Sequence, residues 1–274
     1  MSRSLFVTGL AGLLGGEVAR QALAAGWEVR GTVLDRPCAV DGVEAERVDV
    51  RDAGAVRDAI ARARPDAVVH TAYRQGGPVG RATIVAGSAA VAAAARQVDA
   101  RLVHLSTDVV FSGRLGRPLT EDDAPDPLQQ YGLAKAAAEQ AVAAADPGAV
   151  IVRTSLIHGG PDPGPQERLA LEPFATFFTD ELRCPVHVGD LAAAVLELAA
   201  LDVAGRLHVA GADGVDRLAF ARALAAAAGR DPAELRGAPG GPERPKDCRL
   251  DSTRARALLR TPLRGLDAVG PRLQ

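Results

Sequence analysis

The sequence predicts an α/β protein built on a doubly wound parallel sheet. Three observations predict this fold. Short apolar runs alternate with segments of helical spacing over the first 155 residues. Within each run, almost every residue is apolar, as in strands that are buried on both faces. A glycine-rich turn follows the first run. After residue 155 the alternation weakens. We therefore expect a sheet domain at 1–155 and a smaller C-terminal lobe at 156–274, with the chain re-entering the sheet.

Turn residues delimit the expected elements. Gly26 ends the first helix and Pro65 the second. We expect strands at 4–9, 28–34, 46–50, 66–72, 101–107, 148–155 and near 206–210. We expect helices at 15–26, 53–65, 80–97, 129–145, near 190–201 and near 216–228.

Composition excludes several classes of protein. The chain is 47% hydrophobic and 24% charged, which is ordinary for a globular protein, and its formal net charge of −2 gives no reason to expect nucleic acid or an anionic membrane. Three cysteines without close pairing argue against a disulfide framework or a zinc site and favour the reducing cytoplasm. No apolar stretch is expected to span a bilayer, which takes about 20 residues.

The turn TGLAGLLG opens the first helix. Gly9, Gly12 and Gly15 follow a strand at the spacing that lets a backbone turn tightly and approach a pyrophosphate, which would face the helix N-terminus beside Leu13 and Leu14. The sequence thus predicts a Rossmann-type dinucleotide site. The alternative is a tight turn that needs glycine for its backbone angles alone.

The stretch YGLAK carries the strongest catalytic signal. Tyr131 and Lys135 are one helical turn apart, so both lie on one helix face. A phenol ionises near pH 10, and an adjacent ammonium group lowers that pKa, which makes the phenol a usable general acid. Thr107, in LSTD at the end of a predicted strand, lies at the sheet edge where ligands bind. The alternative for Tyr131 and Lys135 is an ordinary surface pair on an alanine-rich helix, and the alternative for Thr107 is a helix or turn cap.

Three further positions bear on the cofactor. Asp49, followed by Val50, could accept the adenine amino group or serve as a strand-end or helix cap. Asp35 could bind a ribose hydroxyl, whereas Arg36 could pair with a 2′-phosphate. Because no carboxylate occupies the strand end near Val33, we expect NADP(H) in preference to NAD(H); both charges could also be ordinary loop charges.

TGLAGLLG, STDVVFSG, YGLAK and VRTS, in this order, resemble the extended short-chain dehydrogenase/reductases. RPLTEDDAPDPLQQYGLAKAAAEQ, PVHVGDLAAAVLEL and ERPKDCRLDSTRARALL narrow the resemblance to the branch of the dTDP-4-dehydrorhamnose reductases. The resemblance implies an NAD(P)H-dependent reductase of a carbonyl on a nucleotide-linked deoxysugar. It implies the catalytic residues Thr107, Tyr131 and Lys135, with Tyr131 and Lys135 also holding the cofactor.

The same resemblance implies further cofactor contacts. Ala72 and Tyr73 would lie beside the ribose and nicotinamide, and Arg153, Thr154 and Ser155 would flank the carboxamide. One departure is the stretch TIVAGSAAV, which lacks an asparagine frequent in that family. Departures after RTSLIHGG fall where the sugar nucleotide would bind, so the cofactor and the reaction are better predicted than the substrate.

Two other functions stay open. An epimerase or dehydratase of the same fold would need another acid or base; Val109 and Val110 disfavour it, but Asp108 does not exclude it. A cofactor-binding regulatory subunit, as in methionine adenosyltransferase, shares the scaffold. The expected partner is a small molecule, a sugar nucleotide, with no metal, nucleic acid or membrane. A homodimer is kept as one possible assembly.

Overall fold

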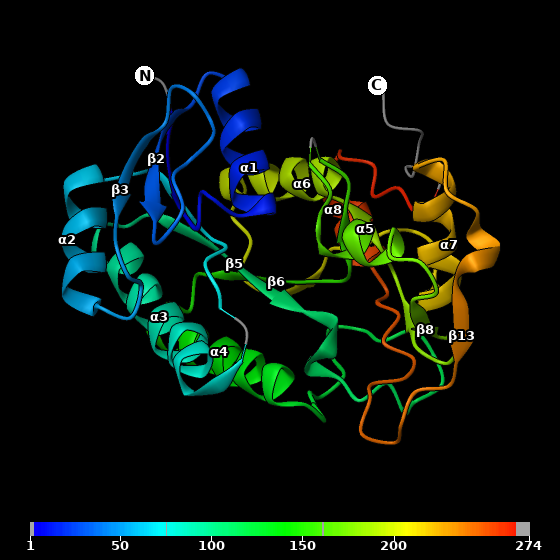
Figure 1. Ribbon diagram of the computed structural model, residues 1–274. Coiled ribbons are helices and arrows are strands. Elements are labelled where there is room, and N and C mark those ends of the chain that lie inside the picture. Colours follow the sequence, from blue (N-terminus) through cyan, green and yellow to red (C-terminus); the bar gives the residue numbers. More distant parts are fainter. Residues whose placement is uncertain (1–2, 75, 161, 267–274) are drawn as a thin grey trace. The chain divides into compact units, whose positions relative to one another are not determined.

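The computed structural model describes residues 3–74, 76–160 and 162–266. Among these residues, seven strands form one sheet in the order β11-β6-β5-β4-β1-β2-β3 (Figure 1). The strands are β1 Ser4–Thr8, β2 Glu28–Val33, β3 Glu44–Arg47, β4 Ala67–His70, β5 Arg101–Thr107, β6 Val150–Thr154 and β11 Gly205–His208. The pairs β1–β2, β2–β3, β1–β4 and β4–β5 are all parallel. The predicted doubly wound Rossmann fold is therefore confirmed.

Helices cover both faces of this sheet. Figure 1 shows α2, α3 and α4 on one face and α1 with α6 on the other. Their bounds are α1 Leu13–Ala24, α2 Ala53–Ala63, α3 Gly77–Gln97, α4 Gln130–Ala145 and α6 Val188–Ala200. One core cluster joins the sheet to α2, α3 and α4 through residues such as Phe6, Ile60, Val91, Val142 and Ile151. Alanines dominate these helices, so they can approach the sheet closely.

The third strand lies earlier than expected. β3 occupies Glu44–Arg47, whereas the sequence predicts 46–50. Val48 and Val50 follow the end of the strand and are buried. Their apolar side chains therefore pack in the hydrophobic core, and these residues do not pair with β2. The strand itself carries exposed charges because it is the sheet edge, where charged side chains discourage pairing with other chains.

The chain forms two compact units. The first comprises residues 1–106, 133–152 and 192–207, and the second comprises 107–132, 153–191 and 208–274. The chain thus leaves the sheet unit at residue 107 as well as near 153, and it returns at 133 and 192. The expected division into domains at residue 155 stays a prediction, and residues 267–274 of the expected lobe lie outside the described residues.

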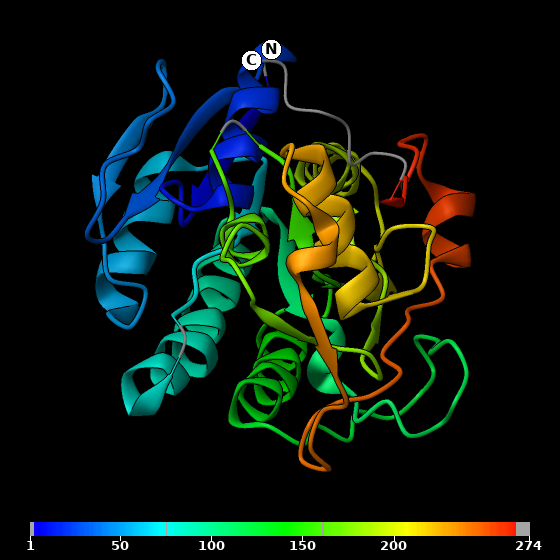
Figure 2. The same ribbon diagram turned by 45° about the vertical axis from the view of Figure 1, so that its right-hand side comes forward.

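The second unit has its own small core and several elements that the sequence did not predict. Its core contains Phe177, Leu218, Phe220, Leu224 and Leu235. The helices are α5 Pro165–Ala170, α7 Arg217–Ala227 and α8 Thr253–Leu258. The strands are β7 Ile157–His158, β8 Thr176–Phe178, β9 Leu182–Arg183, β10 Val186–His187, β12 Val215–Asp216 and β13 Arg236–Ala238. They pair as β7–β10, β9–β12 and β8–β13, and α7 packs against α5 and β8 (Figure 2).

One helix corrects a sequence-based expectation. α3 is long and apolar enough to cross a membrane by length and composition, although no such stretch was expected. Half of its apolar window is buried inside the protein, as in a core helix. A single helix of this kind is weak evidence for a membrane protein. Alanine explains the discrepancy, because it raises mean hydropathy without forming a conspicuous run of large apolar residues.

A buried pair of histidines lies inside the sheet unit. The rings of His70 on β4 and His104 on β5 stack with centroids 5.3 Å apart. His70 is held by Thr8 Oγ1 at 2.6 Å from Nδ1 and Ser88 Oγ at 3.0 Å from Nε2. Neither ring nitrogen of His104 has a hydrogen-bond partner among the described residues. Burial, reinforced by the charge of Lys135, lowers the pKa of His70 to about 3, and that of His104 lies well below its usual value.

These histidines should make the fold sensitive to acid. Between pH 6.5 and about 3 the unfolded chain binds protons that the folded chain rejects, so the free energy of unfolding should fall as the pH falls. Each histidine contributes at most about 1.4 kcal/mol per pH unit. His104→Leu should be at least as stable as the wild type at pH 7 and should lose less stability at pH 5. Urea unfolding at both pH values measures this, and identical pH dependence in the two proteins would contradict it.

Candidate functional site

The glycine-rich turn joins β1 to α1. Gly9 has φ +80°, and a Cβ there would lie 2.9 Å from the backbone of Ala72. A Cβ on Gly15 would lie 2.3 Å from the carbonyl oxygen of Gly9. Two of the three glycines are therefore required by the packing of the turn itself. At Gly12 the nearest atom is the Gly9 carbonyl oxygen, 3.1 Å away, so the fold demands glycine less strictly there and space remains for a ligand.

The start of α1 fits a pyrophosphate group. Gly12 is the N-cap residue, and the first turn of the helix contains no acidic residue. Within the described part of the chain, no side chain caps this helix. The first backbone N–H groups of α1, including those of Leu13 and Leu14, therefore lack a competing side-chain acceptor, which suits an anion. The side chain of Leu14 is buried in the core, so only its backbone could face a ligand.

The structure separates the two charges that follow β2. Arg36 Nη2 donates to the carbonyl oxygen of Ala11 in the glycine turn at 3.0 Å. Asp35 is exposed. Arg36 therefore lies beside the glycine turn.

Asp49 and Val50 occupy different environments after β3. The Asp49 carboxylate pairs with the guanidinium of Arg51, with Oδ2 2.5 Å from Nη2, and this contact lowers the pKa of Asp49. Asp52, and not Asp49, caps α2 by accepting from the backbone of Ala55. Val50 is buried in the core. A role of Asp49 in adenine binding stays a prediction.

Tyr73 and Lys135 lie close together at the carboxyl ends of β4 and β5. The Lys135 Nζ lies 5.7 Å from the centroid of the Tyr73 ring, which is half exposed. Lys135 is buried, and its Nζ donates to the carbonyl oxygen of Leu105 at 2.8 Å. Burial lowers the pKa of Lys135 to about 8, while the charge of Glu139 opposes that shift. The ammonium group is thus largely charged at pH 7 and loses its charge above pH 8.

Glu139 is a supporting residue for which no role was predicted. It lies one turn beyond Lys135 and is buried. Its Oε1 accepts from Ser106 Oγ at 2.6 Å, and its Oε2 lies 3.3 Å from Nε of Arg206. Two contacts, Lys135 with Leu105 and Glu139 with Ser106, therefore fasten α4 to the end of β5. The spacing of four residues between the two charges was the available signal.

Gly132 explains how α4 begins. A Cβ at Gly132 would lie 2.2 Å from the carbonyl oxygen of Val109 and 3.0 Å from the side chain of Pro127. The first turn of α4, which carries the half-buried Tyr131, can approach the segment after Thr107 only because residue 132 has no side chain. The glycine of YGLAK thus serves the placement of Tyr131.

Thr107 is both a cap and a candidate catalytic residue. It is the last residue of β5, and its Oγ1 accepts weakly from the backbone N–H of Val109 at 3.4 Å, which caps the short helix η1 Asp108–Val110. Its hydroxyl donates to Asp108 Oδ1 at 3.2 Å. The capping alternative is therefore confirmed, and the catalytic role stays a prediction.

The end of β6 holds the remaining predicted residues. Arg153 is fully buried, with its guanidinium 4.8 Å from the centroid of Phe111. Thr154 Oγ1 is buried and has no hydrogen-bond partner among the described residues. Ser155 Oγ donates to Asp108 at 2.5 Å and accepts from the backbone of Cys184 at 3.2 Å. The roles of Arg153, Thr154 and Ser155 beside a carboxamide stay predictions.

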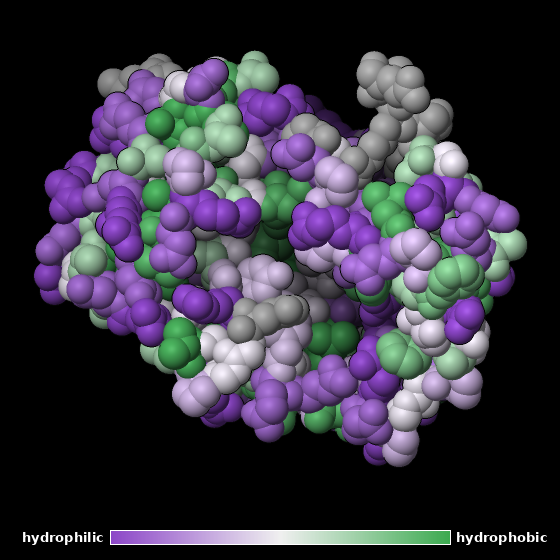
Figure 3. Space-filling view, viewed as in Figure 1, coloured by the Kyte–Doolittle hydropathy of each residue, from purple (hydrophilic) through white to green (hydrophobic). Residues whose placement is uncertain are grey.

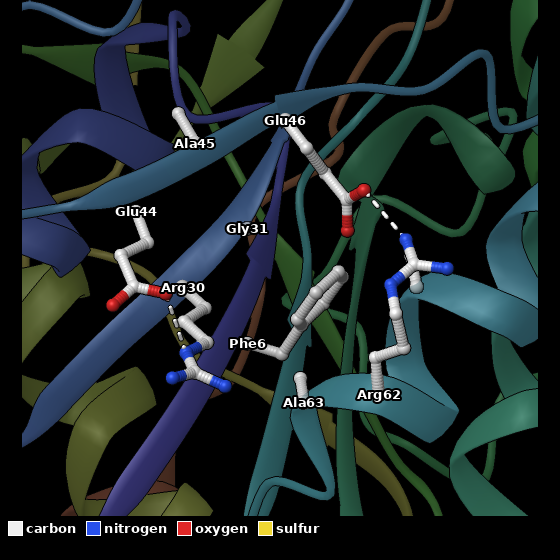
Figure 4. A pocket seen from close by; sticks show the side chains of 9 residues that line it. Phe6, Arg30, Gly31, Glu44, Ala45, Glu46, Arg62 and Ala63 are labelled. Atoms are coloured by element: carbon white, nitrogen blue, oxygen red, sulfur yellow. Dashed lines mark hydrogen bonds and ion pairs between the residues drawn. The ribbon is translucent and has the colours of Figure 1, made fainter.

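A separate pocket lies elsewhere in the sheet unit and contains none of the predicted site residues (Figure 4). Phe6 forms its floor, and Ala59 and Ala63 line its α2 wall. Its rim carries two exposed ion pairs, Arg30–Glu44 and Arg62–Glu46. The start of β3 and the last turns of α2 place it toward the amino ends of the strands, whereas ligands of such sheets bind at the carboxyl ends. Hydrophilic residues predominate on the visible surface around β2, β3 and α2 (Figure 3).

The described residues contain no group of three or more His, Cys, Asp or Glu residues arranged to hold a metal ion. The parallel sheet, its switch in strand order between β1 and β4, and the glycine turn at that switch define a dinucleotide-binding protein of the Rossmann class. The model of the RmlD substrate binding domain family matches residues 3–268. The chain belongs to this family.

Individual relatives agree with the family match. The chain is 34% identical over 284 residues to dTDP-4-dehydrorhamnose reductase of Mycolicibacterium smegmatis, which covers 96% of this chain and 83% of the relative. A hypothetical dTDP-4-dehydrorhamnose reductase from Sulfolobus tokodaii has a similar structure, with a TM-score of 0.83, 28% identity and coverage of 97% of this chain and 98% of that one.

Two further solved structures share the fold and hold a nicotinamide cofactor. The dTDP-4-dehydrorhamnose reductase of Bacillus anthracis, in complex with NADP, has a TM-score of 0.83 at 20% identity and covers 98% of this chain and 97% of its own. The enzyme WbmH of Bordetella bronchiseptica, in complex with NAD+, has a TM-score of 0.84 at 22% identity. The match covers 99% of this chain and 97% of the WbmH chain.

Replacing Gly132 tests the placement of Tyr131. An alanine in a helix normally stabilises by about 1 kcal/mol over glycine, but at this position its methyl group would collide with the Val109 carbonyl. Gly132→Ala should therefore destabilise the protein by about 1–3 kcal/mol, as overpacking does. Thermal unfolding measures this. Leu133→Ala, at a neighbouring exposed position, is the matched control and should change stability much less. A Gly132→Ala protein as stable as the wild type would refute the steric argument.

Proposed function

We propose that this chain is an NAD(P)H-dependent reductase that converts a carbonyl on a nucleotide-linked deoxysugar into a hydroxyl, and that it prefers NADPH. The observation that carries the proposal is the buried Lys135, whose ammonium group is held at the end of β5 one helical turn from Tyr131. The family match over residues 3–268 and the named relatives support the same reaction. A cytoplasmic location and a homodimer belong to this proposal.

Each catalytic residue has a defined task in this reaction. When bound, the reduced nicotinamide supplies the hydride. Tyr131 donates its phenolic hydrogen to the carbonyl oxygen as general acid. Lys135 keeps a positive charge near that phenol and favours its ionised form. Because the pKa of Lys135 is about 8, this assistance should weaken above pH 8. Thr107 contacts the substrate oxygen from the end of β5.

Asp108 argues against the epimerase or dehydratase alternative. An additional acid or base must reach the substrate, but Asp108 is 3% exposed. Its carboxylate accepts from Thr107 and Ser155 and lies 3.7 Å from Nε of Arg183. A carboxylate engaged on both oxygens is poorly suited to exchange protons with a sugar carbon. The reductase therefore remains the better proposal.

Turnover separates the reductase from a regulatory subunit. We expect the purified protein to oxidise NADPH in the presence of dTDP-4-keto-6-deoxysugars, followed by absorbance at 340 nm, the usual signal of the reduced nicotinamide. A protein that binds NADPH but oxidises it with none of these sugars, and that co-purifies with another enzyme, would favour the regulatory alternative.

Tyr131→Phe tests the general acid. The variant should bind NADPH with nearly unchanged affinity and should turn over roughly 10²–10⁴ times more slowly, the usual contribution of a positioned general acid. Steady-state kinetics and calorimetry provide the two measurements. The variant of the other tyrosine, Tyr73→Phe, keeps the aromatic ring and is the matched control for the loss of a hydroxyl. Wild-type turnover in Tyr131→Phe would remove this residue from the mechanism.

Arg36 and Asp35 test the cofactor preference. If Arg36 binds the 2′-phosphate, Arg36→Ala should weaken NADPH by about 1.5–3 kcal/mol, as for a hydrogen bond to a charged group, and leave NADH almost unchanged. The NADPH preference should therefore shrink about tenfold or more. Asp35→Ala removes the neighbouring opposite charge and should not weaken NADPH. A wild type that prefers NADH, with only Asp35→Ala damaging, would overturn the proposed preference.

A further inference from the structure

Both tyrosines of the chain belong to the surroundings of Lys135. The sequence contains only two tyrosines and two lysines, and its other basic residues are arginines and a few histidines. Tyr131 precedes Lys135 by one turn of α4. Tyr73, in the segment after β4, places its ring over the ammonium group, with Nζ 5.7 Å from the ring centroid. A chain that uses tyrosine so rarely therefore has both of its tyrosines beside one lysine, and the proposed reaction gives a task to only one of them.

The ring of Tyr73 lies at the boundary between this ammonium group and the solvent. Lys135 is only 6% exposed, whereas Tyr73 is 52% exposed. The face of an aromatic ring carries a negative partial charge, and it attracts a cation within about 6 Å of the ring centroid. The attraction is stronger where water is excluded, as it is around Lys135. The ring is therefore placed to stabilise the ammonium form of Lys135 over the neutral amine.

The other groups around Lys135 leave its charge finely balanced. Its Nζ donates to the carbonyl oxygen of Leu105 at 2.8 Å, and the negative charge of Glu139 lies one turn further along α4. His70 on β4 and His104 on β5 are neutral at pH 7, because burial places their pKa values far below that pH. Burial also lowers the pKa of Lys135 to about 8. A small additional stabilisation of the ammonium group therefore changes how much of it is charged near neutral pH.

We propose that Tyr73 is a positioning residue whose ring face keeps Lys135 charged, and that its hydroxyl group is not needed for this task. The consequence for catalysis rests on the proposed reductase function, in which the charge of Lys135 favours ionisation of the Tyr131 phenol. Tyr73 thus acts through Lys135 and not on the reacting atoms. Loss of the ring reduces turnover most at alkaline pH, where the ammonium group is already losing its proton.

The sign of one pKa shift distinguishes this role from simple packing. If the ring of Tyr73 only covered Lys135, its removal would admit water to the ammonium group. Better solvation favours the charged form of an amine, so the pKa of Lys135 would rise. If the ring face stabilises the charge, as we propose, its removal lowers the pKa of Lys135. The two roles therefore predict shifts in opposite directions.

An NMR titration of the cofactor-free protein measures this shift directly. Labelling with carbon-13 lysine gives signals from Lys135 and Lys246 alone, because these are the two lysines of the chain. Lys246→Arg identifies which signal belongs to Lys135. Tyr73→Leu keeps an apolar side chain at a half-exposed position but removes the ring face. We expect it to lower the pKa of Lys135 by about 0.5–1 unit. An unchanged or raised pKa would overturn the proposal.

Two control variants assign the shift to the ring. Tyr73→Phe keeps the ring face without the hydroxyl group, so the pKa of Lys135 should stay close to its wild-type value. Trp27→Leu removes another aromatic ring that contacts a cation, since the guanidinium of Arg3 lies 5.5 Å from the Trp27 ring centroid. This variant should leave the titration of Lys135 unchanged. If either control lowers the pKa of Lys135 as much as Tyr73→Leu does, the assignment to the ring face of Tyr73 is wrong.

The pH dependence of turnover tests the catalytic consequence. The ratio of kcat at pH 8.5 to kcat at pH 6.5 should be about threefold lower in Tyr73→Leu than in the wild type, as follows from the lowered pKa of Lys135. Equal ratios in the two proteins would contradict the catalytic part of the proposal. Because the NMR titration needs no turnover, a protein that reduces no keto sugar would refute the proposed function while the titration still decides whether Tyr73 keeps Lys135 charged.

Discussion

The candidate site depends on the burial of one ammonium group. Lys135 lies at the end of the sheet with its Nζ bound to the carbonyl oxygen of Leu105. Taking a charge out of water is costly, and the lowered pKa of Lys135 reflects that cost. The surrounding structure offsets it with the carbonyl dipole, the face of Tyr73 and the carboxylate of Glu139. The same contacts fix the position of α4 on β5, so the electrostatic support and the geometry have one origin.

In the second unit, buried charges are compensated by ion pairs between side chains. Glu181 pairs with the guanidinium groups of Arg183, Arg217 and Arg244. Asp108 lies 3.7 Å from Nε of the same Arg183. Removing one partner from such a cluster leaves an uncompensated buried charge, which is more costly than the pair is stabilising. This cluster therefore favours a single arrangement of the segments that carry it, including the residue that follows Thr107.

The fold was predictable because its signals are local. Buried strands in alternation with helices, and glycines directly after the first strand, predict a doubly wound parallel sheet without any tertiary information. The second unit was less predictable, because β7, β9 and β10 are two residues long and depend on pairing with distant segments. Edge strand β3 was misplaced because its register is set by β2, and its own residues are mainly charged.

The residues of the candidate site were predictable, but the tertiary contacts that hold them in place were not. The spacing of Tyr131 and Lys135 and the glycines of the turn are visible in the chain. The Arg36 contact with Ala11, the Asp108 contact with Ser155 and the steric demand at Gly132 join positions far apart in sequence, or depend on atoms of the backbone. Periodicity and composition carry no information about such contacts, so only the folded chain identifies them.

The fastening of α4 to β5 has a consequence for how the protein can diversify. Two hydrogen bonds position the ammonium group of Lys135 and the carboxylate of Glu139: one joins Lys135 to Leu105, and the other joins Glu139 to Ser106. Neither bond involves a residue between 156 and 187. Outside the buried pair Glu181 and Arg183, substitutions in that stretch can therefore accumulate without moving the ammonium group. A gene duplicate of this chain has freedom to acquire a new substrate range while its reaction is inherited unchanged.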